Sequence, residues 1–217
     1  MLKIHIITIF PESFKSYLES SIIWRAKEKW LLDISLYKLN DFSDKKFRHV
    51  DDKAFWTHWQ VISPEPLSKA IISIFENVWK KIPVIYMTPT WILLNQKKVE
   101  NLSKKLEEFI IICGHYEWID QRIIDLYVTH EISIWKYVLT SWELASMVFI
   151  DSIARFIPKV LWNPLSLEEE SFSKKLSGKK EFPHYTKPRN FLWLEVPKVL
   201  LSWNHKEIEE WKKNNLK

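Results

Sequence analysis

Short apolar runs alternate with amphipathic stretches over the first 160 residues of the chain. Five of these runs are predicted to be strands, at residues 4–10, 33–39, 83–88, 109–113 and 137–140. Between them, apolar side chains recur at helical spacing, which predicts helices at residues 14–29, 64–78, 117–127 and 144–156 and one that begins after Asn95. Apolar strands that alternate with amphipathic helices form a parallel sheet covered on both faces, so the pattern predicts an α/β fold.

The pattern changes after Pro158. Residues 161–188 are polar, lysine-rich and interrupted by prolines, which is typical of a linker. Asn204 with Glu207 three residues later fits a capping box that opens a last helix. Residues 40–58 are also polar and are predicted to be a long loop. We therefore predict a main domain at residues 1–160, a linker at 161–188 and a small helical region at 189–217.

Composition places the chain among ordinary globular proteins. An apolar fraction of 47% with 27% charged residues excludes disordered, collagen-like and coiled-coil classes. The single Cys113 allows no internal disulfide, and the 7 His show no zinc-ligand spacing. These two observations predict a cytoplasmic protein with no resident metal site. Since no run of 18 apolar residues occurs, we also predict that the chain has no membrane segment.

Positive charge is concentrated at the C-terminal end. From Ser171 to Lys217 the chain has 11 Lys or Arg against 5 Asp or Glu, a net charge of +6, whereas the first 170 residues have 21 against 22, a net charge of −1. This asymmetry fits a protein that holds a polyanion with its C-terminal part. A lysine-rich surface that only confers solubility explains the charge equally well.

Glycine and tryptophan occur in unusual numbers, with 2 Gly and 13 Trp. Tryptophan normally lies among periodic apolar neighbours. Here it follows predicted strands (Trp91, Trp118, Trp142), ends a predicted helix (Trp30) or lies in the polar loop (Trp56, Trp59). These are positions where a chain requires positive φ or a close approach of the backbone, which glycine supplies.

Two explanations fit this placement to different degrees. Tryptophans that stack on single-stranded nucleic acid would be interleaved with Lys and Arg on strands, and that pattern is not seen. The alternative is that all of them except Trp211 are glycines in the natural protein. A codon that the source reads as glycine, with UGA as the leading candidate, would then have been translated as tryptophan.

With glycine at those positions, eight stretches in order along the chain resemble the bacterial tRNA (guanine-N1-)-methyltransferases of the SPOUT class. They are ITIFPESF (7–14), IIWRAKEKWLLDI (22–34), RHVDD (48–52), CGHYEWID (113–120), EISIWKYVLTSWELA (131–145), DSIARFIPKVLW (151–162), FPHYTKP (182–188) and LEVPKVLLSWNH (194–205). The resemblance covers nearly the whole chain.

The resemblance implies a SPOUT-type parallel sheet with a C-terminal trefoil knot in the main domain and a small helical C-terminal domain that binds tRNA. It also implies methylation, dependent on S-adenosylmethionine, of N1 of guanosine 37, just 3′ of the anticodon. The active sites of a homodimer would lie at the subunit interface. The cofactor-binding residues it implies are Tyr86, Thr88, Pro89, Gly114, Tyr116, Glu117, Ile134, Trp135, Lys136, Tyr137, Val138 and Leu139.

Catalysis requires removal of the guanine N1 proton and stabilisation of charge that develops toward O6. By resemblance Glu170 is the base, where the family has aspartate, although Glu169 is an alternative. Arg155 matches the catalytic arginine, but it is also spaced to pair with Asp151 on a helix surface. The resemblance further assigns Glu117, His184 and Lys187 to substrate binding.

Several features depart from the family pattern. His115 replaces the usual arginine, the loop FWTHWQ is shorter than usual, and the chain ends at Lys217, before typical members do, so we expect the last helices to be incomplete. The resemblance makes Mg²⁺ a candidate cofactor, although no ligand cluster points to it. A non-catalytic RNA-binding protein and a SPOUT methyltransferase for another RNA site are the alternative functions.

Overall fold

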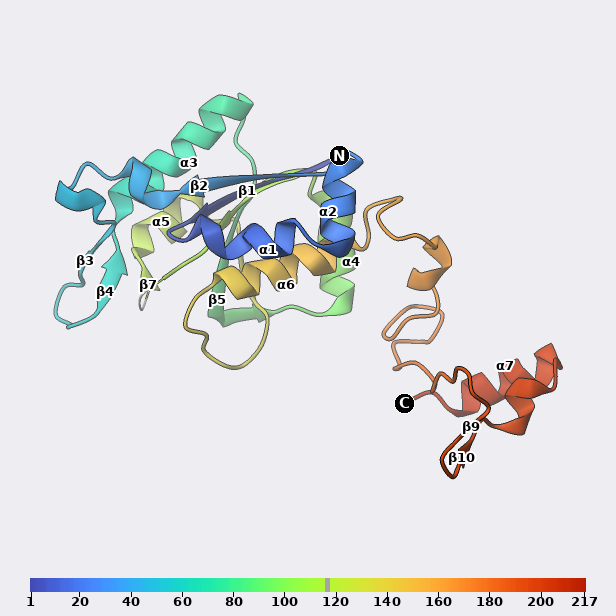
Figure 1. The fold of residues 1–217 in the computed structure, drawn as a ribbon. Coiled ribbons are helices and arrows are strands. Elements are labelled where there is room, and N and C mark those ends of the chain that lie inside the picture. The colour runs from blue at the N-terminus through green and yellow to red at the C-terminus, as the bar shows by residue number, and fades with distance from the viewer. Residues whose placement is uncertain (116–117) are drawn as a thin grey trace. The chain divides into compact units, whose positions relative to one another are not determined.

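The computed structural model describes residues 1–115 and 118–217, which divide into two compact units, residues 1–162 and 163–217. The first unit is a twisted sheet with helices on both faces (Figure 1). The second is a small assembly of helical turns, a short hairpin and one helix. Among the described residues, no helix has the length and apolar character needed to cross a bilayer.

A five-stranded sheet in the order β2-β1-β6-β5-β8 forms the centre of the first unit. Its strands are β1 (Leu2–Thr8), β2 (Leu32–Lys38), β5 (Val84–Leu93), β6 (Glu108–Ile112) and β8 (His130–Ser133). Every neighbouring pair is parallel. The predicted α/β class is therefore confirmed, and the carboxyl ends of all five strands lie along one edge.

Helices cover both faces of this sheet. They are α1 (Lys15–Leu18), α2 (Ser21–Glu28), α3 (Pro64–Val78), α4 (Gln96–Lys105), α5 (Gln121–Tyr127) and α6 (Glu143–Ala154). Leu18, Val99 and Phe149 belong to one buried apolar cluster, and Ile71 and Ile123 belong to the other. The two clusters are the apolar layers between helices and sheet, as the continuous apolar strands predict.

The predicted loop at residues 40–58 is wrong in part, because it contains a strand. β3 (Asp51–Lys53), β4 (Gln60–Ile62) and β7 (Trp118–Ile119) form a second sheet in that order. Short 3-10 helices at Leu39–Phe42 and Lys46–Arg48 precede it. β7 also shortens the helix predicted at 117–127, which begins only at Gln121. These strands have two or three residues, too few for alternation to reveal.

Two further predictions are wrong. Residues 137–140 form no strand in the described chain, and the strand of this region is β8. Tyr137 and Val138 are instead exposed in the segment that follows β8. The helix predicted at 14–29 is divided into a 3-10 turn (Pro11–Phe14), α1 and α2, because Ser21 has φ 48° and interrupts the helical hydrogen bonds.

The second unit has a small core of its own. It contains the 3-10 turns Pro164–Leu167 and Lys198–Leu201, the hairpin β9 (Asn190–Phe191) and β10 (Leu194–Glu195), and α7 (His205–Asn214). Leu176 and Phe182 are buried, and the Phe182 ring meets the Trp211 ring edge-on at 6.3 Å between centroids. Asn204 caps α7, since its Oδ1 accepts the backbone N–H of Glu207 at 3.4 Å, and its Nδ2 also donates to Glu207 Oε1 at 2.8 Å.

Candidate active site

Three segments meet at the carboxyl edge of the sheet. Gly114 lies two residues after the end of β6, Tyr86 lies in the neighbouring β5, and Trp142 directly precedes α6. A Cβ on Gly114 would lie 2.8 Å from Trp142 Cδ1 and 3.3 Å from Tyr86 Cε2. The space above Gly114 is thus filled by the indole ring, and no larger residue fits at 114. Ends of adjacent parallel strands are where α/β proteins bind ligands.

The structure brings the predicted cofactor residues to this edge in different environments. Tyr86 and Thr88 are buried in β5, and Pro89 is half-buried. In the segment after β8, Ile134 and Leu139 pack against the core, whereas Trp135, Lys136, Tyr137 and Val138 are exposed. Tyr116 and Glu117 lie outside the described residues.

Tyr86 has an unusual environment. Its Oη is buried without a hydrogen-bond partner among the described residues, and its ring meets Trp118 edge-on at 6.2 Å. Burial raises the pKa of Tyr86, so the phenol stays neutral and keeps its proton available for donation. A buried polar group of this kind normally has a partner, and a bound ligand is one source of it.

A buried polar contact that the sequence analysis missed lies at the same edge. Thr8 Oγ1, at the end of β1, donates to Glu143 Oε1 at the start of α6 over 2.6 Å. Nearby, Cys113 Sγ and Ser146 Oγ are 3.1 Å apart. Burial raises the pKa of Cys113, which keeps the thiol protonated and unreactive. Thr8 and Glu143 are 135 positions apart in the sequence, so no local signal reveals their contact.

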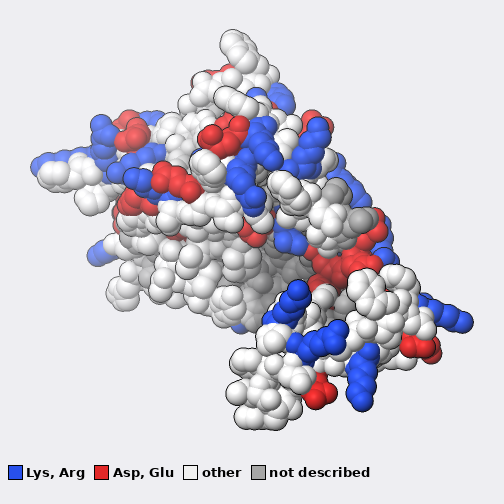
Figure 2. Space-filling view, turned by 45° about the vertical axis from the view of Figure 1, so that its right-hand side comes forward, with Lys and Arg blue, Asp and Glu red and all other residues white. Residues whose placement is uncertain are grey.

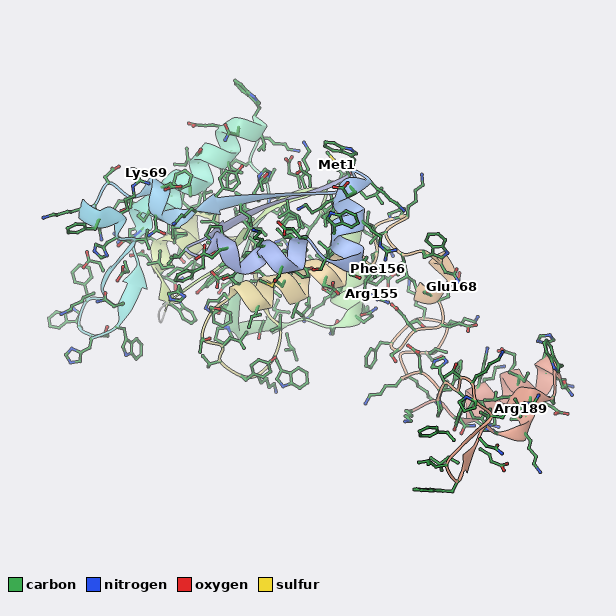
Figure 3. The ribbon with its side chains drawn as sticks, in the orientation of Figure 1. Met1, Lys69, Arg155, Phe156, Glu168 and Arg189 are labelled. Atoms are coloured by element: carbon green, nitrogen blue, oxygen red, sulfur yellow. The ribbon has the colours of Figure 1, made fainter. Side chains whose placement is uncertain are left out.

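The two predicted catalytic residues lie in different units. Arg155 directly follows α6 as its C-cap residue, beside Phe156 (Figure 3), and its backbone N–H donates to Asp151 O at 3.4 Å. Glu170 is half-buried in the second unit, where its carbonyl accepts from Ser173 N at 3.1 Å. His184 and Lys187 are exposed in the same unit, and His184 Nε2 lies 3.0 Å from Glu181 Oε2.

Glu169, the alternative base, is already engaged in ion pairs. Its Oε1 lies 2.5 Å from Lys175 Nζ and its Oε2 lies 3.7 Å from Lys212 Nζ on α7. The hydrogen bond from Lys175 lowers the pKa of Glu169. A carboxylate with a lowered pKa is a weaker base, so this environment weakens Glu169 as a candidate for proton removal.

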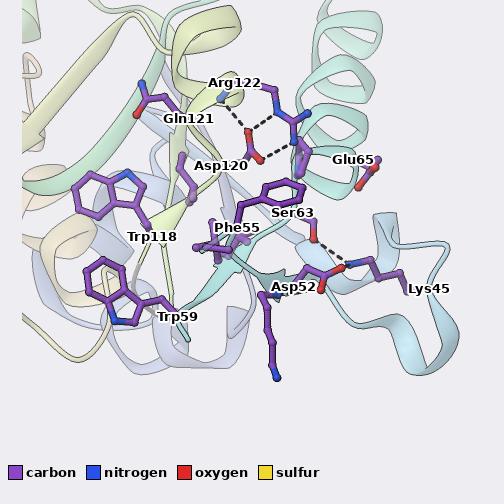
Figure 4. Close-up of a pocket in the computed structure, with 16 residues that line it drawn as sticks. Lys45, Asp52, Phe55, Trp59, Ser63, Glu65, Trp118, Asp120, Gln121 and Arg122 are labelled. Atoms are coloured by element: carbon purple, nitrogen blue, oxygen red, sulfur yellow. Dashed lines mark hydrogen bonds and ion pairs between the residues drawn. The ribbon is translucent and has the colours of Figure 1, made fainter. Parts of the chain in front are cut away.

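A cavity of about 860 Å³ lies between the β3–β4 hairpin and the start of α5 (Figure 4). The rings of Phe55, Trp59 and Trp118 line one part of it. Charged pairs line the rest: Lys45 Nζ lies 3.1 Å from Asp52 Oδ2, and Arg122 Nη2 lies 2.8 Å from Asp120 Oδ2. Two of these three rings, Trp59 and Trp118, stand at positions where the sequence analysis predicts glycine, so only Phe55 is an aromatic wall that does not depend on that prediction.

The Asp120–Arg122 pair in this cavity makes stability depend on pH. Asp120 caps α5, and the side-chain hydrogen bond from Arg122 lowers the pKa of Asp120. The folded-state pKa is below the unfolded one, so the carboxylate contributes stability above the unfolded pKa and loses it as pH falls through the folded pKa. We expect Asp120→Asn to lower the free energy of unfolding by about 0.5–1 kcal/mol at neutral pH and progressively less below about pH 4.

Urea titrations of the parent and the variant at several pH values measure this difference. Arg122→Gln is the matched variant, because it removes the same ion pair from the other side and should give the same pH dependence. A difference that stays constant from neutral to acidic pH would contradict the assignment.

Charge on the surface is distributed rather than confined to one patch. On the face that Figure 2 shows, Lys and Arg side chains are spread widely with Asp and Glu among them. In the second unit Lys187, Arg189 and Lys198 are at least partly exposed. Exposed cations on a small unit suit contact with a phosphate backbone, which requires many weak attractions.

Comparisons with known proteins cover nearly the entire chain. Residues 2–217 match the model of the family described as tRNA (Guanine-1)-methyltransferase TrmD. A tRNA (guanine-N(1)-)-methyltransferase of Clostridioides difficile is 47% identical over 98% of this chain and 91% of its own length. That of Carboxydothermus hydrogenoformans is 46% identical over 98% and 81%. The crystal structure of tRNA (m1G37) methyltransferase from Aquifex aeolicus matches with a TM-score of 0.80 and 34% identity, over 98% of this chain and 88% of that one.

Proposed function

Because this chain belongs to the tRNA (guanine-1)-methyltransferase family, we propose that it is the enzyme that methylates N1 of guanosine 37 in tRNA. The observation that carries the proposal is similarity at 47% identity through both units, rather than through the sheet alone. A protein that shared only the fold would match the sheet and diverge in the second unit.

S-adenosylmethionine is the methyl donor in this proposal, and it supplies an activated methyl group. Gly114 leaves its backbone accessible, and the unpartnered Tyr86 Oη offers a hydrogen bond at the same place. Both features fit a nucleoside held by backbone groups. The Trp142 ring, however, fills the space over Gly114. The residues therefore fit the cofactor once position 142 carries glycine.

Each catalytic role in the proposal follows from the charge of the side chain. Glu170 accepts the N1 proton, which leaves a lone pair at N1 to form the new bond to the methyl carbon. The sulfur of the donor would keep the electron pair of its broken bond to that carbon and leave as a thioether. Arg155 stabilises the negative charge that moves toward O6. Glu117 accepts hydrogen bonds from guanine donors, and His184 and Lys187 contact the tRNA backbone.

The remaining parts of the proposal concern organisation. We assign residues 1–160 to the methyltransferase domain with its trefoil knot, 161–188 to a connecting segment whose residues from 163 onward belong to the second unit, and 189–217 to tRNA binding. The protein acts in the cytoplasm as a homodimer. Mg²⁺ stays a candidate cofactor only, because the described residues include no group of three or more His, Cys, Asp or Glu that could hold it. The trefoil knot and the dimer stay predictions that follow from the family.

The proposal includes the natural identity of twelve tryptophans, which we take to be glycines. Two of them support this directly. Trp30 has φ 55°, its N–H donates to Lys27 O, and Leu31 N donates to Ala26 O after α2. Trp79 has φ 56° and the same pair of bonds after α3, and its side chain is 93% exposed. This arrangement ends a helix with a left-handed residue, which is usually glycine.

Trp211 provides the contrast. It is half-buried on α7, and its ring meets Phe182 and Tyr185 edge-on, each at 6.3 Å. A genuine tryptophan is expected to have such apolar neighbours. We therefore keep Trp211 and assign glycine to the other twelve, a form that we name the glycine-restored chain.

The codons of the gene test this part. UGA at the twelve positions and UGG at Trp211 is the expected result, and UGG throughout would contradict it. The intact mass of the protein purified from its source gives the same answer independently.

The activity is tested with purified tRNA. We expect the glycine-restored chain to transfer labelled methyl groups to a tRNA with guanosine at position 37 and not to the same tRNA with adenosine there. Binding of tRNA without any transfer would favour the non-catalytic RNA-binding protein, and transfer to another RNA position would favour a different SPOUT activity.

A further inference from the structure

Glu143 is a buried carboxylate to which the proposed mechanism gives no role. Its side chain stands in the first turn of α6, and the residue is 2% exposed. Oε1 accepts the Thr8 hydroxyl at 2.6 Å, whereas Oε2 is buried without a hydrogen-bond partner among the described residues. One half of the carboxylate is thus satisfied and the other half is not.

A purely structural role does not explain this arrangement. A buried carboxylate oxygen without a donor destabilises the folded state, and an apolar side chain of similar volume would often be more favourable there. The α6 N-terminus offsets part of this cost, because its dipole attracts negative charge. The unsatisfied oxygen nevertheless indicates a donor that the described residues do not supply.

The surroundings of Glu143 connect it to the cofactor site. Thr8 Oγ1 also accepts the backbone N–H of Phe10 at 2.9 Å, so one hydroxyl joins the end of β1 to α6. The Phe10 ring then meets the His115 ring edge-on at 5.0 Å, in the segment that contains Gly114. On the other side, Glu143 directly follows Trp142, whose ring covers Gly114.

We infer that Glu143 is a positioning residue for the methyl-donor site. Oε1 fixes the chain after β1 through Thr8, and Oε2 accepts a hydrogen bond from a donor that comes into place when S-adenosylmethionine binds. The inference rests on the proposed function, since it requires that Gly114 and its neighbours hold this cofactor.

Glu143→Gln separates positioning from folding. The amide keeps an oxygen that accepts the Thr8 hydroxyl and places an NH2 group where Oε2 was. The group that would donate to Oε2 when the cofactor binds then faces another hydrogen-bond donor. We expect a melting temperature equal to or above that of the parent, because a buried carboxyl oxygen without a hydrogen-bond donor has been removed. We also expect the dissociation constant for S-adenosylmethionine, measured by calorimetry, to rise about 10-fold or more. An unchanged dissociation constant would overturn the inference.

Thr8→Val and Thr8→Ser form a matched pair. Valine is nearly isosteric but loses the hydroxyl, so we expect about a 10-fold higher KM for the cofactor with kcat changed far less. Serine keeps the hydroxyl and should restore the parent KM. If both variants share the parent KM, or if serine gives no rescue, Glu143 has only a structural role.

The parent in these experiments is the chain that the codons specify. A parent that transfers no methyl group to tRNA would mean that the proposed function fails. If instead the parent transfers methyl groups and the variants bind the cofactor normally, only the role of Glu143 fails.

Discussion

A chain that keeps Trp142 and has glycine at the other eleven positions will bind S-adenosylmethionine at least about 100-fold more weakly than the glycine-restored chain. The reason is steric, because Trp142 Cδ1 comes within 2.8 Å of where a Cβ on Gly114 would lie. A ligand that contacts the Gly114 backbone needs the surface that this ring covers. Moving a buried indole elsewhere breaks its packing and costs free energy comparable to that of a core truncation.

Calorimetric titration of both chains measures the difference, and thermal unfolding adds an independent test. Without ligand, the chain that keeps Trp142 is expected to be the more stable of the two, because the ring fills a cavity. With ligand, only the glycine-restored chain should gain stability, since binding to the native state raises the melting temperature.

A chain that keeps Trp79 instead is the matched control. Trp79 is exposed at the end of α3 and has a left-handed backbone, so glycine there relieves strain without touching the sheet edge. We expect this control to bind the cofactor as the glycine-restored chain does and to melt at a lower temperature. Equal cofactor affinity in the chains with and without Trp142 would show that the ring does not block the site.

The sequence correctly predicted the helices and strands that are specified by residues within the same segment. α3 spans Pro64–Val78 as predicted, because proline begins it and apolar residues repeat at helical spacing. Asn95 caps α4 by accepting the Lys98 backbone N–H at 3.0 Å. The short strands were not predicted, because β4 and β7 are stabilised by pairing with each other. Neither segment's own sequence indicates this pairing.

The error at residues 137–140 has a specific cause. Tyr137, Val138 and Leu139 are apolar, which suggested a buried strand, but Val138 is 80% exposed. The true strand, β8, contains His130 and Glu131 and lies at the edge of the sheet, where polar residues are tolerated. Apolar composition therefore misplaced the strand by several residues.

The sequence predicted site residues only where they lie within a short motif that resembles the family. The family resemblance pointed to Gly114 and Tyr86, and the structure brings them together at one edge. The Thr8–Glu143 contact was not predictable, because neither residue has a neighbour in sequence that indicates the other. The ion pairs of Glu169 likewise join positions that only the folded second unit brings together.

Glu170→Gln will lower kcat for methyl transfer about 10²–10⁴-fold, while the affinities for tRNA and S-adenosylmethionine change little. Glutamine has nearly the same shape but cannot accept the guanine N1 proton, so binding survives and proton removal does not. Single-turnover transfer of labelled methyl groups measures the chemical step, and filter binding measures tRNA affinity.

Glu169→Gln is the control that the structure supplies. This neighbouring carboxylate is already paired with Lys175 and Lys212, and the hydrogen bond from Lys175 lowers the pKa of Glu169. Its loss should weaken contacts within the second unit and leave the chemical step within about threefold of the parent. A larger loss for Glu169→Gln than for Glu170→Gln would transfer the role of base to Glu169. Equal, small losses in both would mean that neither carboxylate takes the proton, because removing the true base must slow the chemistry itself.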